Sequence, residues 1–184
     1  MVVKQSSQAH WFQGLSLNCP AKAAETEIIL PNFGKEWYNG FEVIELLKVF
    51  LVEDECVVRE GLRECIEWTR YGFEFCGDAP DGELALPQIR KLRPDILITD
   101  IKMPFMDGLA LSKLVCAELP ETKIILISGH NDFEFAQEAI EIGVEQYLLK
   151  PVTKASLLKT LEDVSRKIDE EREQKAYLRQ FQQE

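Results

Sequence analysis

The sequence predicts an α/β fold, with a parallel five-stranded sheet that is covered by helices on both faces. Between about residues 47 and 166, short apolar runs alternate with segments of helical periodicity, which is the pattern of repeated βα units. The apolar runs are hydrophobic throughout rather than at every second residue, as strands covered on both faces are. Because ligand sites in such folds form at the carboxyl ends of the strands, a functional site is expected at that edge of the sheet.

Each expected strand is a short, mostly aliphatic run bounded by turn-forming or charged residues. The strands are expected near residues 48–53, 73–77, 95–100, 123–128 and 145–149. The third run shows the pattern clearly. Ile96 to Ile98 is apolar, Asp100 ends the run, and Pro104 requires the chain to turn soon afterwards.

Helical periodicity separates the strands and continues after the last one. Helices are expected near residues 56–68, 82–92, 108–118, 132–142 and from 154 onward. Asn131 or Asp132 is expected to cap the fourth helix, and Gly143 is expected to end it. Pro87 falls inside the second helix, where it should remove a hydrogen bond and bend the helix.

The segment before the first strand differs from the rest of the chain. Residues 1–46 contain scattered glycines, prolines and aromatic residues without a sustained period, which predicts a disordered or loosely docked extension. The domain itself is expected to begin near Leu46 or Leu47 and to end near residue 166. The preceding residues are then interpreted as the product of an upstream start assignment.

One long helical pattern runs from Lys154 to the C-terminus. Its apolar seam is formed by Leu157, Leu161, Val164 and Ile168, and Glu171 and Lys175 interrupt that seam. Residues 167–184 therefore allow two interpretations. They are either the charged, solvated end of an amphipathic helix on the sheet, or a helical linker that begins a coiled coil with another domain or a second copy.

The composition excludes several classes of function. A net charge of −11 argues against a chain that grips nucleic acid through its phosphates, and against a basic helix on a membrane surface. No run approaches the roughly 20 apolar residues of a membrane helix. The five cysteines show no Cys-x-x-Cys spacing, which favours reduced thiols and a cytoplasmic protein.

Chemically useful residues stand at four strand ends. Glu53 and Asp54 follow the first strand, Asp100 ends the third, Ser128 ends the fourth and Lys150 follows the fifth. Carboxyl ends of parallel strands share one edge, so these side chains are expected to lie together. Carboxylates that close to one another raise each other's pKa or recruit a cation, and Mg²⁺ is the natural hard cation for oxygen ligands.

A pocket of this kind suits a phosphoryl group. A divalent ion, a lysine and a hydroxyl donor stabilise phosphoryl oxygens, and a central carboxylate can form an aspartyl phosphate. Asp100 is best placed as nucleophile, because it ends the central strand and has no acidic neighbour. Taken singly, Asp54 could be a helix cap, Ser128 a turn residue and Lys150 a surface lysine; together they favour a site. A cis peptide before Pro151 could fix the direction of the lysine, although trans is the commoner isomer.

These residues carry a family resemblance. Residues 47–166 resemble the receiver domain of two-component response regulators, and the matching pieces are Val49–Glu55, Pro94–Gly108, Ile124–Gly129 and Tyr147–Pro151. The run from Ser128 to Gln137 is similar to receivers of the YesN type, which usually precede an AraC-type helix-turn-helix domain. The resemblance implies a flavodoxin-like (CheY-like) fold with strand order 2-1-3-4-5.

The resemblance also implies a ligand set and a phosphate source. A partner sensor histidine kinase would donate phosphate to Asp100. Glu53, Asp54 and Asp100 would hold Mg²⁺ together with the backbone carbonyl of Lys102. Glu53 stands where many receivers have aspartate, so its longer side chain is a candidate for binding the ion through water.

A conformational switch is implied as well. Ser128, which replaces the commoner threonine, would contact the phosphoryl group together with Lys150. Tyr147 would then turn into the space that Ser128 leaves. The side chains of Lys102 and His130 flank the site and are candidates for setting how fast the phosphate is lost.

The sequence is therefore identified as a phosphorelay receiver and not as an enzyme. It is interpreted as part of a transcription regulator that would bind DNA only through an output domain absent from this sequence. A homodimer through the C-terminal helix or the 132–149 face is possible. The alternatives are a stand-alone receiver, a pseudo-receiver that only docks, and a phosphatase of the haloacid dehalogenase type, which would need a second aspartate at position 102.

Overall fold

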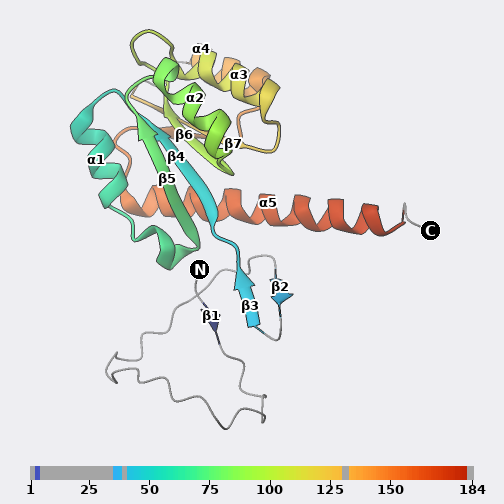
Figure 1. Ribbon diagram of the computed structural model, residues 1–184. Coiled ribbons are helices and arrows are strands. Elements are labelled where there is room, and N and C mark those ends of the chain that lie inside the picture. Colours follow the sequence, from blue (N-terminus) through green and yellow to red (C-terminus); the bar gives the residue numbers. More distant parts are fainter. Residues whose placement is uncertain (1–2, 5–34, 39–40, 130–132, 182–184) are drawn as a thin grey trace, which may run out of the picture.

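The computed structural model describes residues 3–4, 35–38, 41–129 and 133–181 of the 184-residue chain (Figure 1). Its main body is a five-stranded sheet with helices on both sides. Within those ranges, no helix combines the length and the apolar character that crossing a bilayer requires.

The sheet is parallel throughout. Its strands are β4 (Leu47–Val52), β5 (Phe73–Ala79), β6 (Ile96–Asp100), β7 (Lys123–Ser128) and β8 (Gln146–Leu149). Their spatial order is β5-β4-β6-β7-β8, which is the order 2-1-3-4-5 counted from β4. The fold class predicted from the sequence is therefore confirmed. The strand order reverses between β4 and β6, and ligands bind at such switch points.

Five helices cover the two faces of the sheet. They are α1 (Cys56–Glu64), α2 (Gly82–Leu92), α3 (Gly108–Glu118), α4 (Phe133–Ile142) and α5 (Lys154–Phe181). Helices α1 and α5 lie on one face, and α2, α3 and α4 lie on the other (Figure 1). Alternation along β4 explains the two cores: Val49 and Leu51 pack toward α1 and α5, whereas Phe50 and Val52 pack toward α2 and α3.

The first helix is shorter than expected. It was predicted to run to residue 68, but α1 ends at Glu64 and a separate 3₁₀ turn follows at Trp68–Tyr71. The indole N–H of Trp68 donates to the carbonyl of Arg63 at 2.8 Å, so it replaces the bond that a continuing helix would make. The Trp68 ring is buried, with its centroid 5.3 Å from that of Phe75. Burial of this ring therefore ends the helix early.

Other helix boundaries follow the prediction. Gly143 has φ 86° directly after α4, as expected for a glycine that ends a helix. The proposed caps Asn131 and Asp132 lie outside the described residues. Helix α2 continues through Pro87, which is exposed, so the proline does not end the helix.

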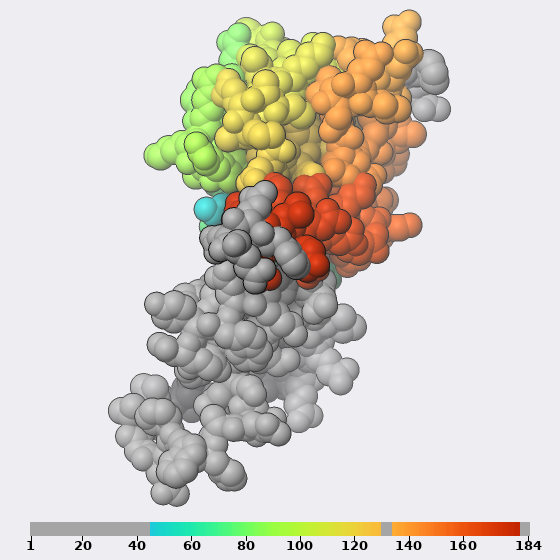
Figure 2. All heavy atoms as spheres, turned by 90° about the vertical axis from the view of Figure 1, so that its right-hand side faces the viewer, coloured from blue at the N-terminus to red at the C-terminus, as the bar shows by residue number. Residues whose placement is uncertain are grey.

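Helix α5 packs on the sheet and then extends past it (Figure 1). The four predicted seam residues are buried in the core shared with α1, as an amphipathic helix on the sheet requires. Glu171 and Lys175 continue the same side of the helix and form ion pairs with Lys123 and Glu121. Figure 2 shows the red end of α5 directly below the yellow and orange part of the surface.

A small antiparallel sheet precedes the main one. Its strands are β1 (Val3–Lys4), β2 (Lys35–Tyr38) and β3 (Phe41–Ile44), in the order β1-β3-β2. These strands were not expected in the N-terminal extension, because their residues show no sustained alternation. Residues 1–2, 5–34 and 39–40 of that extension lie outside the described part of the chain, and its role and the division near Leu46 stay predictions.

Candidate functional site

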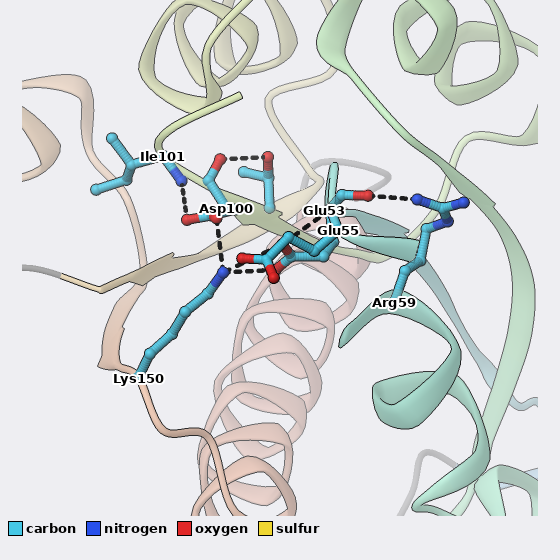
Figure 3. A network of polar contacts seen from close by, with 7 residues as sticks. Glu53, Glu55, Arg59, Asp100, Ile101 and Lys150 are labelled. Atoms are coloured by element: carbon cyan, nitrogen blue, oxygen red, sulfur yellow. Dashed lines mark hydrogen bonds and ion pairs between the residues drawn. The ribbon is translucent and has the colours of Figure 1, made fainter. Parts of the chain in front are cut away.

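Asp100 lies at the switch point of the sheet. It is the last residue of the central strand β6 and is 6% exposed. Its carboxylate is held on both oxygens: Oδ1 accepts a hydrogen bond from the backbone N–H of Ile101 at 2.7 Å, and Oδ2 lies 2.7 Å from Nζ of Lys150 (Figure 3). The carboxylate therefore has a fixed direction at the carboxyl edge of the sheet.

The start of α3 fixes the backbone of Asp100. Asp107 caps that helix by accepting a hydrogen bond from the N–H of Ala110 at 2.7 Å. The N–H of Gly108 donates to the carbonyl of Ile101 at 2.9 Å. A β-carbon at position 108 would lie only 2.0 Å from the carbonyl oxygen of Asp100. The helix can approach the site this closely only because residue 108 is glycine.

Glu53 brings a second carboxylate to the site from the end of β4. Its side chain is fully buried, and Oε1 accepts a hydrogen bond from Lys150 at 3.1 Å. Oε2 lies 2.9 Å from the same Nζ, an ion-pair distance, but it makes no hydrogen bond of its own. Burial raises the pKa of Glu53, and the charge of Asp100 adds to that rise against the hydrogen bond from Lys150.

Lys150 joins the two buried carboxylates. It follows β8, its peptide bond to Pro151 is cis, and its N–H donates to the carbonyl of Ser128 at 2.7 Å. Burial alone lowers the pKa of Lys150, but its hydrogen bonds and ion pairs with Asp100 and Glu53 outweigh that effect and raise it. Lys150 is therefore a permanent positive charge at neutral pH.

The acidic residues form one cluster. Glu53, Asp54 and Asp100 each offer a carboxylate oxygen, and these oxygens lie within 4.8 Å of one another. One lysine balances only part of this charge, and Oε2 of Glu53 is buried without a hydrogen bond. A donor set made only of oxygen, with exposed Asp54 on the solvent side, suits a hard divalent cation such as Mg²⁺.

The remaining predicted residues lie around this cluster. Ser128 ends β7, the neighbour of β6, and is buried. Lys102 lies in the loop after β6, with its Nζ 5.5 Å from the ring centroid of Phe135 on α4. Tyr147 lies on β8 and is half-buried against the core on the α2–α4 face. His130 lies outside the described residues.

Two contacts at the site were not predicted. Gly108 was expected only to begin a helix, whereas the structure places it against the backbone of Asp100. Arg59 was not singled out, yet its guanidinium donates to the carbonyl of Glu53 at 2.7 Å. The sequence feature that could have indicated this contact is the position of Arg59, one helical turn after Glu55. At that spacing, its side chain lies on the side of the helix that faces the end of the strand.

Comparison with protein families identifies the class to which this fold belongs. The model of the response regulator receiver domain matches residues 49–162. This match covers more than half of the chain, so the chain belongs to the family of response regulator receiver domains. These domains are the signalling modules of two-component systems.

Two curated proteins that resemble the chain are named as transcriptional regulatory proteins. It is 40% identical over 119 residues to the uncharacterized transcriptional regulatory protein YesN of Bacillus subtilis (strain 168), which covers 65% of the chain and 32% of YesN. It is 38% identical over 112 residues to the transcriptional regulatory protein HptR of Staphylococcus aureus (strain N315), which covers 61% of the chain and 44% of HptR. The chain thus matches less than half the length of either curated relative.

Solved receiver structures agree with the fold. The receiver domain of AraT, a response regulator from Geobacillus stearothermophilus, is 40% identical, with a TM-score of 0.65. The match covers 69% of this chain and 98% of that domain. A CheY-like receiver domain from Methanospirillum hungatei JF-1 has a TM-score of 0.63 at 23% identity, which bears on the fold alone.

Proposed function

We propose that this chain is a receiver that is switched by phosphorylation of Asp100 by a sensor histidine kinase. The observation that carries the proposal is the carboxylate of Asp100, oriented by Ile101 and Lys150 at the carboxyl end of the central strand. A carboxylate oxygen attacks phosphorus as the P–N bond to the kinase histidine breaks. The new P–O bond makes an acyl phosphate, and the leaving imidazole takes up a proton.

The neighbouring side chains have separate roles in this step. Glu53, Asp54, Asp100 and the backbone carbonyl of Lys102 would hold Mg²⁺, which neutralises phosphoryl oxygens when bound. Lys150 already contacts Asp100, so it is in place to bind a phosphoryl oxygen on the product.

Removal of the metal tests the proposal directly. The chain should gain one phosphoryl group from acetyl phosphate in MgCl₂ and none when EDTA chelates the metal, because three crowded carboxylates repel an anionic donor. Intact-mass spectrometry measures the gain, and hydroxylamine should reverse it by cleaving the acyl phosphate. Equal uptake with EDTA would contradict the proposed site.

The switch is proposed to run from Ser128 to Tyr147. In the sheet, Leu126 on β7 is the register partner of Tyr147 on β8, and Ser128 follows two residues later along β7. Tyr147 packs with Leu126 in the core on the α2–α4 face. If the hydroxyl of Ser128 moves toward the phosphoryl group, the space it leaves is next to Tyr147. A bistable packing of this kind converts a local charge into a change of surface.

Tyr147→Ala separates this switch from the chemistry. The variant should take up phosphate like the wild type, because the change leaves Glu53, Asp54, Asp100 and Lys150 in place and alters a side chain that packs against the core on the α2–α4 face. It should weaken the dimer of the phosphorylated chain about tenfold, the usual size of such coupling. Sedimentation of phosphorylated samples measures the dissociation constant, and Tyr147→Phe, which keeps the ring, serves as the control. Unchanged dimer affinity in Tyr147→Ala would count against the switch.

The wider context of the proposal is transcription regulation. Two curated relatives are named as transcriptional regulatory proteins, and the net charge of −11 disfavours DNA binding by this chain directly. Exposed Ile140 and Leu149 mark the 132–149 face as one candidate dimer surface, and α5 is the other. The four described cysteines are free thiols, which supports a cytoplasmic setting.

A further inference from the structure

Arg59 on α1 connects the turn after β4 to the end of β5. Its Nη1 donates to the carbonyl of Glu53 at 2.7 Å, and its Nε lies 3.4 Å from a carboxylate oxygen of Asp78 (Figure 3 shows the first of these contacts). The side chain is 17% exposed, so this arginine is largely enclosed. A guanidinium is planar and presents several donors, so one arginine can make both contacts at once.

Both backbone polar groups of Glu53 are bound to this part of the sheet. Its N–H donates to the carbonyl of Ala79 on β5 at 3.1 Å. Its carbonyl accepts from Arg59, which itself pairs with Asp78 on β5. The position of Glu53, and of Asp54 immediately after it, is thus set relative to β5 by two links, its own N–H and the side chain of Arg59.

Helix α1 has one other hydrogen bond to this turn, a long one, in which the N–H of Glu55 donates to Oε1 of Glu53 at 3.4 Å. Its N-cap, Glu55, makes no side-chain capping bond. Leu62 is its one buried residue, and Cys56 and Val57 in the first turn are exposed. At 2.7 Å, the bond from Arg59 is the shorter of these two hydrogen bonds from α1 and its N-cap to Glu53.

We infer that Arg59 is a positioning residue that holds Glu53 and Asp54 in the geometry required for Mg²⁺. The inference rests on the proposed metal site and goes beyond it by adding a residue that does not touch the ion. Arg59 binds the carbonyl of Glu53 and not the clustered carboxylates. Its effect on the metal is therefore geometric.

Charge and geometry predict opposite signs for one variant. Arg59→Ala removes a positive charge near a cation site, so electrostatics alone would tighten Mg²⁺ binding. Loss of positioning would weaken it. We expect the loss of positioning to dominate, so the Mg²⁺ dissociation constant should rise about tenfold or more, which corresponds to about 1.4 kcal/mol of binding free energy.

The experiment measures Mg²⁺ binding to the full chain without a phosphodonor. NMR titration with MgCl₂ would follow the backbone amide of Ile101, which donates to Asp100. Arg63→Ala is the matched control, because Arg63 also pairs with Asp78, at 3.5 Å, whereas the guanidinium bound to the carbonyl of Glu53 is that of Arg59. Its affinity should stay within about twofold of the wild type, and Arg59→Lys should recover part of the loss.

The outcomes are distinct. An Arg59→Ala affinity equal to or tighter than that of the wild type, or equal to that of Arg63→Ala, would overturn the inference while leaving the metal site in place. A wild-type chain that does not bind Mg²⁺ would overturn both. If Arg59→Ala does not fold, Arg59→Met decides, because it keeps the aliphatic stem and removes the donor to the carbonyl of Glu53. Wild-type affinity in that variant would also reject a positioning role.

Discussion

Asp100→Asn is expected to abolish phosphoryl uptake from acetyl phosphate in the presence of Mg²⁺. An asparagine amide is a very poor nucleophile, and the replacement also removes one of the three clustered carboxylates. Asn keeps the size of the side chain, and its carbonyl oxygen can still accept from the N–H of Ile101. The variant should therefore remain folded while uptake, read by intact mass, falls below detection.

The same strand provides the control. Asp95 immediately precedes β6, at the end opposite Asp100, and pairs with Arg172 on α5. Asp95→Asn should take up phosphate at the wild-type rate, because it changes an aspartate on the same segment far from the acidic cluster. Uptake by Asp100→Asn at the wild-type rate would reject Asp100 as the phosphoacceptor, and loss in both variants would indicate a general effect on folding.

Gly108→Ala is expected to have the largest effect on stability of any single methyl addition near the site. The new β-carbon would lie 2.0 Å from the carbonyl oxygen of Asp100 and 3.1 Å from Cα of Ile101. These are backbone atoms, so neither a rotamer change nor a flexible side-chain end can relieve the overlap. The destabilisation should reach about 3 kcal/mol, the upper part of the range for overpacking. Phosphoryl uptake should also slow, since α3 can move away only by shifting Asp100.

Gly61 in α1 is the matched control. A β-carbon there has no neighbour within 4 Å, and the residue is exposed within the helix. Gly61→Ala should therefore raise the free energy of unfolding by about 0.5–1 kcal/mol, because alanine is the better helix former. Urea unfolding of both variants gives the comparison. A Gly108→Ala chain as stable as the wild type would contradict the close approach described for α3.

Sequence reasoning could predict that these strand-end residues lie together, because their proximity follows mainly from the topology of the sheet. Strands that are apolar on both faces and alternate regularly with helices form a parallel sheet. In a parallel sheet, the carboxyl ends of all strands lie at the same edge. Residues at the strand ends, such as Asp100 and Lys150, therefore meet regardless of how far apart they are in the chain. Their ion pair follows from the order of elements and not from any local pattern.

The features that sequence reasoning missed depend on packing between elements. Helix α1 ends at Glu64 because the indole of Trp68 binds a carbonyl of the helix and is buried. The periodicity of apolar residues gives no information about that contact. Likewise, Arg59 reaches a backbone carbonyl, which has no sequence signature, and the role of Gly108 depends on the distance between a helix and a strand.

The ion pairs along α5 also fix its rotation about its own axis. Glu171, Arg172 and Lys175 pair with residues at or just before the amino ends of β6 and β7. These pairs set the direction in which each later side chain points from the helix axis. An α-helix turns about 100° per residue. The exposed pair Tyr177 and Leu178 therefore points in one direction in the frame of the sheet, and one residue inserted before it would turn that direction by more than a right angle. The pairs are surface ionic contacts, which salt screens. A rise in salt concentration would therefore weaken the restraint on the rotation of this end of α5 before it affected the core.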